Sequence, residues 1–332
     1  MIAPPIQCTM DGHSQKILAD RRTYMRIAIV ILFATGFATG IVFSAEYFKP
    51  QPRAEASQPA SAAEVLAAKD AFTGISLYAQ GAIVADIDTG AILYKHNADA
   101  QLPLASLTKV PLVLTVSEVM APESQITILQ DTSYNSKASQ LHAGEKWRTA
   151  DLISYTLVAS SNDGAQTLSD AADEALRSKY PQAGGSGTLW RMNNLSQSLG
   201  LKETYFLNST GLDISSTQSG AYGSARDMAK LFAYAAKSEP ELFAKTATSS
   251  ISITSLDGSV AYAQNTDEAL DSIPGMIMGK TGFTDLAGGN LAVVFAANGK
   301  RYVAVVLGST EVGRFTDIQQ LVGVIRSLPT SQ

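Results

Sequence analysis

Three short motifs in this chain carry side chains that could together perform acyl transfer. Ser106 and Lys109 belong to a Ser-Leu-Thr-Lys sequence, Ser160 and Asn162 to Ser-Ser-Asn, and Lys280 begins Lys-Thr-Gly. A serine hydroxyl becomes a good nucleophile only when a base removes its proton, and a lysine serves as that base only when its pKa is depressed. The motifs therefore predict a serine nucleophile that is activated without histidine.

The spacing within the first motif predicts which residues are partners. Lys109 follows Ser106 by three residues, so on a helix the two side chains share one face. A second cation close to a buried lysine lowers its pKa, and Lys280 is the candidate for that cation. Taken alone, the first motif also allows Ser106 to be a helix cap and Lys109 an exposed residue of the first turn, because serine is favoured at N-caps.

The residues after Lys280 suit contact with an extended substrate. Gly282 has no side chain to block a backbone that approaches along the edge of a strand. Thr281 and Thr284 offer hydroxyl groups to a substrate carboxylate, and Phe283 lies between Gly282 and Thr284. We expect Thr281, Gly282 and Thr284 to form the substrate-binding part of the site.

The elements that would position these motifs follow from the apolar pattern. Strands are expected at 82–86, 91–94, 290–296 and 302–307. Asn298-Gly299 between the last two is a strong hairpin signal. Helices are expected at 104–120, 149–159, 165–176, 189–199, 224–236 and 314–328. This order predicts an α/β fold, with an antiparallel sheet built from both chain ends, flanked by helices, and an inserted helical subdomain.

The N-terminal region predicts a membrane anchor. Residues 27–45 form an uncharged apolar run of about the length that crosses a bilayer as a helix. Basic residues outnumber acidic ones in 1–26, which predicts a cytoplasmic tail. Phe43 is bulky where a signal-peptide cleavage site would be small, so we expect the anchor to be uncleaved. Residues 46–64 then form a Pro/Ala/Ser-rich linker, and 65–332 a catalytic domain outside the membrane.

Composition excludes several other classes of protein. The chain of 332 residues is 45% hydrophobic, as expected for a globular protein, and its net charge of -5 argues against a nucleic-acid partner. Cys8 is the only cysteine, so an intrachain disulfide is impossible. His96 and His142 lack metal-ligand spacing, and we expect them at the surface. No metal ion or cofactor is expected.

The sequence around the motifs resembles one enzyme family. The similar segments are GAIVADIDTGAILYKHNADAQLPLASLTK at 81–109, GLKETYFLNSTGLD at 200–213, SARDMAKL at 224–231 and KTGFTDLAGGNLAVV at 280–294. They are similar to the D-alanyl-D-alanine carboxypeptidases, the low-molecular-weight serine penicillin-binding proteins of the DD-peptidase/β-lactamase superfamily. The resemblance implies the transpeptidase-like fold of that superfamily.

The resemblance also implies roles for the motif residues. Ser160 would relay protons between Lys109 and Lys280 toward the leaving amine, and Asn162 would contact the substrate amide. The backbone N–H groups of Ser106 and Phe283 would hold the oxyanion. The implied substrate is a peptidoglycan stem peptide ending in D-Ala-D-Ala, and β-lactams would acylate the same serine.

Two departures from the family pattern stand out. Ser209-Thr210 replaces the usual Pro-His in the 200–213 segment, and we expect this to change only a loop. Pro111 falls early in the nucleophile helix, where an interior proline would remove a hydrogen bond and bend the helix. Neither change is expected to touch a motif residue.

Two alternative functions remain open. A class A β-lactamase shares the three motifs, but its glutamate in an E-x-x-x-N arrangement has no counterpart, because Glu203 stands five residues before Asn208. A catalytically silent wall-binding homologue would keep the groove without turnover. The presence of Ser106, Lys109 and Lys280 together argues against such a binder.

Overall fold

The structure, a computed structural model, describes residues 66, 70–129 and 140–329. These lie in a unit formed by residues 58–332. The expected tail, anchor and linker fall outside the described residues. Within the described part of the chain, no helix combines the length and the apolar character that a membrane span requires.

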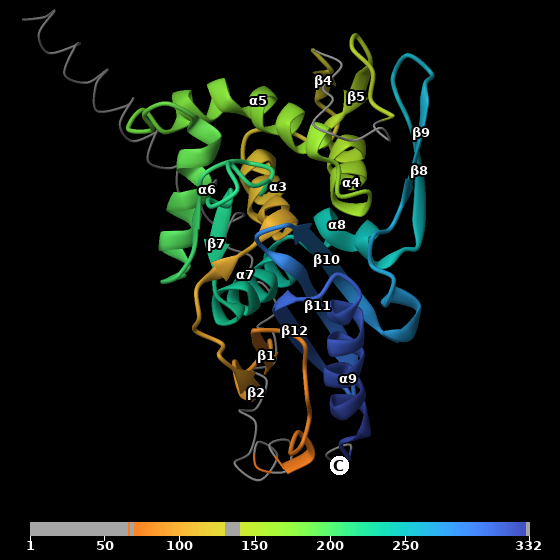
Figure 1. Ribbon diagram of the computed structural model, residues 1–332. Coiled ribbons are helices and arrows are strands. Elements are labelled where there is room, and N and C mark those ends of the chain that lie inside the picture. Colours follow the sequence, from red (N-terminus) through yellow and green to blue (C-terminus); the bar gives the residue numbers. More distant parts are fainter. Residues whose placement is uncertain (1–65, 67–69, 130–139, 330–332) are drawn as a thin grey trace, which may run out of the picture. The chain divides into compact units, whose positions relative to one another are not determined.

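A five-stranded antiparallel sheet brings together the two ends of the described chain. Its spatial order is β10-β11-β12-β1-β2 (Figure 1). The strands are β1 Gly81–Asp86, β2 Ile92–His96, β10 Met276–Thr284, β11 Gly288–Ala297 and β12 Lys300–Ser309. Asn298 and Gly299 adopt positive φ values of 52° and 75°, as the hairpin between β11 and β12 requires. The expected sheet built from both chain ends is confirmed.

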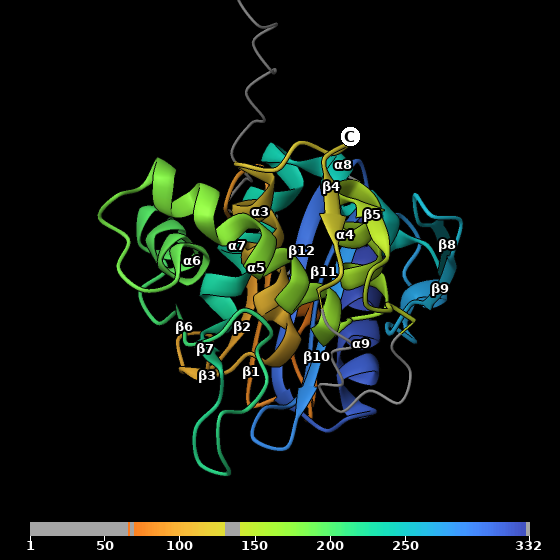
Figure 2. The same ribbon diagram turned by 90° about the horizontal axis from the view of Figure 1, so that it is seen from above.

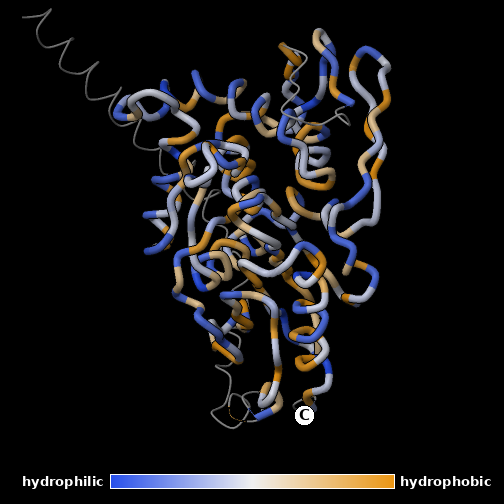
Figure 3. Tube along the Cα trace, in the orientation of Figure 1, coloured by the Kyte–Doolittle hydropathy of each residue, from blue (hydrophilic) through white to orange (hydrophobic). Residues whose placement is uncertain are grey.

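Both faces of this sheet are buried, so its central strands are almost wholly apolar. Along β12, Val303 and Val305 belong to one core, whereas Ala304 and Val306 belong to the other. Helix α9, Gly313–Ser327, covers the second face, and helix α7, Ala225–Ser238, packs on the first (Figure 2). Hydrophobic and hydrophilic residues recur in turn along α9, as expected for a helix with one face on a sheet (Figure 3).

The helices of the inserted region lie between β2 and β10 in the sequence. They are α3 Lys109–Ser117, α4 Thr149–Val158, α5 Asn162–Lys179 and α6 Gly187–Ser198, and the expected helices are confirmed apart from their ends. The helix expected at 104–120 is instead a 3₁₀ turn, η1 Ala105–Thr108, followed by α3. Pro111 is the third residue of α3, where the N–H has no partner inside the helix. The expected loss of a hydrogen bond at Pro111 is therefore wrong.

Several short elements complete the fold and were not expected. They are β3 Leu102–Pro103, β4 Gln125–Thr127, β5 Lys146–Arg148, β6 Tyr205–Phe206, β7 Ala221–Gly223, α8 Pro240–Phe243, η2 Ala244–Ala247, η3 Leu270–Ser272, and the hairpin β8 Ser250–Thr254 with β9 Val260–Gln264. This hairpin buries alternate residues, among them Ile253 and Ala261, on the side that contacts α4. That two-residue period is the usual signal of a half-buried strand.

Candidate active site

The nucleophile segment is a tight turn whose neighbours are buried. Ala105 adopts a positive φ of 46°, which is uncommon for a residue with a side chain. The Thr108 hydroxyl donates a hydrogen bond of 2.7 Å to the Ala105 carbonyl. Within residues 104–116, all of which the structure describes, Ser106 alone is not buried. The core therefore anchors this segment while the Ser106 hydroxyl stays accessible.

Lys109, the first residue of α3, is fully buried, and its amine has three partners. The Lys109 Nζ atom lies 2.8 Å from Ser106 Oγ, 2.8 Å from Asn162 Oδ1 and 3.0 Å from the Thr210 carbonyl oxygen. Burial, and after it the positive charge of Lys280, holds the pKa of Lys109 well below its usual value. A neutral amine keeps two N–H groups for Asn162 and Thr210. Its lone pair can then accept the proton of Ser106.

The second motif forms the turn between α4 and α5. Ser160 has a positive φ of 55°, and the Ser161 side chain caps α5 by accepting a hydrogen bond from its first turn. This turn directs Ser160 toward Lys280 and Asn162 toward Lys109. Ser160 is therefore hydrogen-bonded to one of the two lysines that it was expected to connect, and Asn162 contacts the other.

Lys280 extends from β10 into the site from the opposite side. Its ammonium group donates hydrogen bonds of 2.8 Å to Ser160 Oγ and 2.9 Å to the Thr281 carbonyl. Burial, followed by the charge of Arg314, lowers the pKa of Lys280 to about 7, and Asp267 acts in the opposite direction. Both lysines predicted from the sequence therefore lie in one buried site.

Gly282 brings β10 directly against the nucleophile segment. A Cβ atom on Gly282 would lie 2.9 Å from the Leu104 carbonyl oxygen and 3.1 Å from the Ser106 nitrogen. The glycine that we expected to admit substrate is thus also needed for packing, since a side chain would push the strand from the serine. The two N–H groups expected to hold the oxyanion, those of Ser106 and Phe283, belong to these adjoining segments.

The three remaining motif residues differ in their surroundings. Thr281 is buried, and its hydroxyl shares a 2.5 Å hydrogen bond with that of Thr266. The Thr284 hydroxyl donates a 3.0 Å hydrogen bond to the Asp213 carboxylate. Phe283 is 43% exposed. A substrate carboxylate at Thr284 would approach the Asp213 carboxylate.

A loop that contains one of the two departures from the family pattern touches the site directly. The Thr210 carbonyl accepts the hydrogen bond from Lys109, so the expectation that this segment contacts no motif residue is wrong. Asn208 Oδ1 accepts a 2.7 Å hydrogen bond from the Gly211 N–H, which fixes the loop. A Cβ atom on Gly211 would lie 1.9 Å from the Ala105 carbonyl oxygen. A contact made by a backbone carbonyl has no residue-type signal in the sequence.

Two buried charged residues near β10 were also missed. Arg314, in the first turn of α9, donates a 3.1 Å hydrogen bond to the Gly282 carbonyl, while its Nε has no partner among the described residues. Burial lowers the pKa of Arg314. Asp267 precedes η3 and is 5% exposed. A single arginine or aspartate carries no motif, so only the folded structure places these two residues beside the site.

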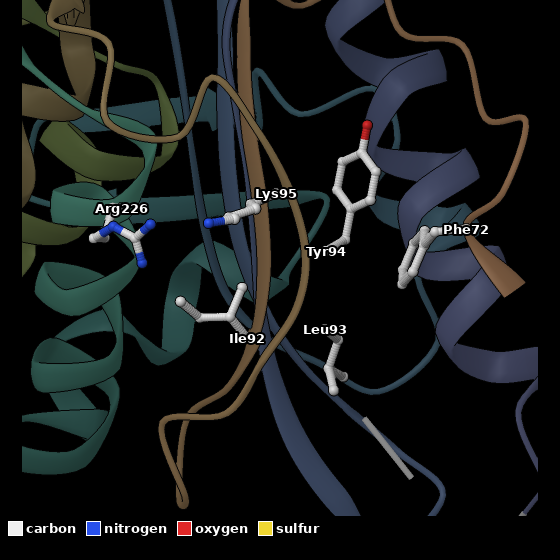
Figure 4. A pocket seen from close by; sticks show the side chains of 6 residues that line it. All are labelled: Phe72, Ile92, Leu93, Tyr94, Lys95 and Arg226. Carbon is white, nitrogen blue, oxygen red and sulfur yellow. The ribbon is translucent and has the colours of Figure 1, made fainter. Parts of the chain in front are cut away.

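A surface pocket beside β2 lies at the other edge of the sheet (Figure 4). Its lining residues are Phe72, Ile92, Leu93, Tyr94, Lys95 and Arg226. Arg226 pairs with the carboxylate of Asp99 at 2.9 Å. This pocket contains none of the three motifs and no serine next to a lysine, so it is not the candidate active site.

No metal centre is found in the part of the chain that the structure describes. That part has no group of three histidine, cysteine, aspartate or glutamate side chains placed to hold an ion. His96 and His142 are exposed, as expected.

The geometry of the site defines a class of enzyme. A serine and a lysine from the helical region face a lysine on the edge strand of an antiparallel sheet. This geometry defines the class of serine acyltransferases that includes penicillin-binding proteins and class A β-lactamases.

Known proteins place the chain within that class. Residues 65–311 match the family model described as D-alanyl-D-alanine carboxypeptidase. The chain is 29% identical over 230 residues to the D-alanyl-D-alanine carboxypeptidase DacB2 of Mycobacterium tuberculosis, covering 69% of this chain and 74% of that protein. It is 26% identical over 257 residues to a D-alanyl-D-alanine endopeptidase of Pseudomonas aeruginosa, covering 76% and 77%.

A solved structure agrees with this family. Penicillin-binding protein D2 of Listeria monocytogenes in its ampicillin-bound form superposes with a TM-score of 0.64 at 29% identity, covering 76% of this chain and 98% of that one. The chain belongs to the D-alanyl-D-alanine carboxypeptidase family. The expected family, the fold and the enzyme class, a serine-type D-alanyl-D-alanine carboxypeptidase, are confirmed.

Proposed function

We propose that the protein removes the terminal D-alanine from peptidoglycan stem peptides through an acyl-enzyme on Ser106. The observation that carries the proposal is the environment of the Lys109 amine. It lies 2.8 Å from Ser106 Oγ, and its two other partners are both hydrogen-bond acceptors. Such an amine is ready to take a proton from the serine.

The proposed reaction begins when Ser106 Oγ attacks the carbonyl carbon between the two D-alanines. Its proton passes to Lys109, and the N–H groups of Ser106 and Phe283 stabilise the oxyanion. The C–N bond then breaks, and the leaving nitrogen takes a proton from the network of Ser160 and Lys280. Water attacks the resulting ester, which frees the shortened peptide and restores Ser106.

We assign the substrate's terminal carboxylate to Thr281 and Arg314. Arg314 is a buried guanidinium with an unpartnered Nε, and it already donates to the carbonyl of Gly282 on β10. Arginine binds carboxylates well because its planar N–H groups match their geometry. This pairing supports a preference for peptides with a free C-terminal carboxylate.

The β-lactamase alternative needs a glutamate in an E-x-x-x-N arrangement to activate water, and Glu203 and Asn208 do not have that spacing. The Glu203 N–H, in the turn before β6, donates a hydrogen bond to the Asp227 carboxylate of α7, and the Asn208 side chain holds its own loop through Gly211. Among the described residues, no carboxylate forms a hydrogen bond with Lys109. We therefore expect slow hydrolysis of a penicilloyl ester, whose tethered thiazolidine also crowds the approach of water.

The test is to incubate the soluble domain with diacetyl-Lys-D-Ala-D-Ala and measure free D-alanine, with Ser106→Ala as control. Release of D-alanine that depends on Ser106, together with slow release of penicilloate, supports the proposal. Rapid penicillin turnover without D-alanine release would identify a β-lactamase. A stable fold with neither D-alanine release nor a penicillin adduct would identify a silent wall-binding homologue.

We further propose that residues 27–45 anchor the chain and that the catalytic domain lies outside the membrane. The support is the uncharged apolar run, preceded by basic residues and followed by a Pro-rich linker. Mass spectrometry of the mature N-terminus tests this. A mature chain that begins near Glu46 would instead indicate a cleaved signal peptide.

A further inference from the structure

Asp267 is a buried carboxylate beside β10 to which the proposed reaction assigns no role. It is 5% exposed, and its Oδ1 atom accepts a 2.9 Å hydrogen bond from the Ala269 N–H. Its Oδ2 atom is buried and has no partner among the described residues. A Cβ atom built on Gly279 would lie 3.5 Å from Oδ2, so this oxygen faces the strand at the residue before Lys280. Such an unpaired oxygen costs stability and calls for an explanation.

The groups around Asp267 are mostly cationic. Lys280 and Arg314, both buried, interact with its charge, and the exposed Glu268 adjoins it. Lys109 faces Lys280 from α3 and interacts with its charge. Two buried cations without an anion would tend to lose a proton. Among the described residues, Asp267 is a buried carboxylate whose charge opposes this loss at Lys280.

We propose that Asp267 is a positioning residue that keeps Lys280 protonated, so that Lys280 donates to Ser160 and Lys109 remains the neutral base. The inference rests on the proposed acyl transfer. Its geometric basis is the cluster itself, in which Asp267 lies on a loop whose Thr266 is hydrogen-bonded to Thr281, the residue after Lys280. Asp267 contacts no reacting atom and acts through Lys280.

The directions of the pKa shifts agree with this role. Burial and then Arg314 lower the pKa of Lys280 to about 7, whereas Asp267 raises it. Burial raises the pKa of Asp267 to about 6, so it is mostly ionised at neutral pH. Removing the carboxylate charge should lower the pKa of Lys280, which then loses its proton at a lower pH.

The test is the pH dependence of penicillin acylation in Asp267→Asn, which keeps the shape of the side chain and removes its charge. The acylation rate should fall at alkaline pH as Lys280 loses its proton. In Asp267→Asn this fall should occur about one pH unit lower, which is the smaller end of the usual effect of a neighbouring charge on a pKa. Glu268→Gln is the matched control, because it removes the same charge from an exposed neighbour, and its profile should stay in place. If Asp267→Asn does not fold, Asp267→Ser replaces it in the same pH measurement.

A second measurement does not need turnover. NMR titration of ¹³C-labelled lysine, with the Lys280 signal assigned by its loss in Lys280→Arg, should show the lower midpoint directly in Asp267→Asn. Unchanged midpoints and superposed profiles overturn the proposal. An equal loss of rate at every pH would show a merely structural role and also overturns it. Absence of acylation in the wild type would contradict the proposed function, while the NMR midpoint would still test Asp267.

Discussion

The site has a helical side, formed by the first two motifs, and a strand side, formed by β10. Each side carries a buried lysine, Lys109 on the helical side and Lys280 on the strand side, but the charges around the two lysines differ. The Lys109 and Lys280 amines each lie 2.8 Å from a serine hydroxyl. The further partners of Lys109 are the neutral oxygens of Asn162 and Thr210. Lys280 instead interacts with the charges of Arg314 and Asp267. We therefore expect similar local geometry to serve two roles, with Lys109 as the base and Lys280 as the cation because of the neighbouring charges.

The two sides also differ in how they are assembled. On the helical side, Ser106 and Lys109 are close because they are three residues apart. On the strand side, Lys280 is surrounded by residues from separate elements, including Arg314 of α9 and Asp267 of the loop before η3. Local spacing therefore predicts the nucleophile and base, whereas folding specifies the surroundings of Lys280.

Loss of the nucleophile should give the largest effect. Ser106→Ala is expected to abolish the covalent penicillin adduct, because no other hydroxyl lies within hydrogen-bonding distance of the Lys109 amine in the described structure. Intact-mass analysis measures the adduct. Ser160→Ala is the control and should still be labelled, though more slowly. Labelling of the Ser106 variant would show that the nucleophile lies elsewhere.

Arginine at each lysine position tests the two roles against each other. Lys109→Arg should slow acylation by at least about a hundredfold, the usual scale for losing a general base, because arginine stays protonated. Lys280→Arg keeps the cation and should therefore lose less. Stopped-flow acylation by a chromogenic β-lactam measures both. Equal losses in the two variants would contradict the assignment of different roles.

Gly211 tests the loop that supplies the Thr210 carbonyl to the helical side. In Gly211→Ala the new Cβ atom would lie 1.9 Å from the Ala105 carbonyl oxygen, at a φ of 80°. We expect a loss of about 2 kcal/mol or more in unfolding free energy, together with slower acylation. Gly90→Ala is the matched control, since Gly90 has a φ of 75° with no atom within 4 Å of its Cβ position. Urea unfolding measures both variants. Equal losses of unfolding free energy in Gly211→Ala and Gly90→Ala would show that the strain of a positive φ causes the loss, and not the contact with Ala105.

The last prediction concerns the pH dependence of stability. Lys280 has a pKa of about 7 when folded, against an ordinary value of 10.5, so the unfolded state binds more protons between these values. Stability gained from this group therefore rises with pH, by at most about 1.4 kcal/mol per pH unit. Lys280→Met lacks this gain. From pH 7 to pH 10, the free energy of unfolding of the wild type should therefore rise relative to that of Lys280→Met. A difference that stays constant would show that the pKa of Lys280 is unshifted.

Much of the fold and the motif residues could be predicted from local patterns. Asn298-Gly299 indicated its hairpin because few residue pairs adopt two positive φ values easily. The helix expected at 104–120 was wrong at its start, since the turn around Ala105 is held by tertiary contacts such as that with Gly211. The β8–β9 hairpin was missed although its alternating pattern was present.

The sequence by itself predicted the nucleophile, the paired base, a sheet built from both chain ends and the family, because these depend on residue types and local patterns along the chain. Only the tertiary structure decided that the Thr210 carbonyl orients Lys109 and that Arg314 and Asp267 flank Lys280. The physical reason is that a pKa depends on burial and on charges in space, whatever their separation in the chain. Residues far apart in sequence therefore shift the pKa values of the two lysines, as Arg314 and Asp267 do for Lys280.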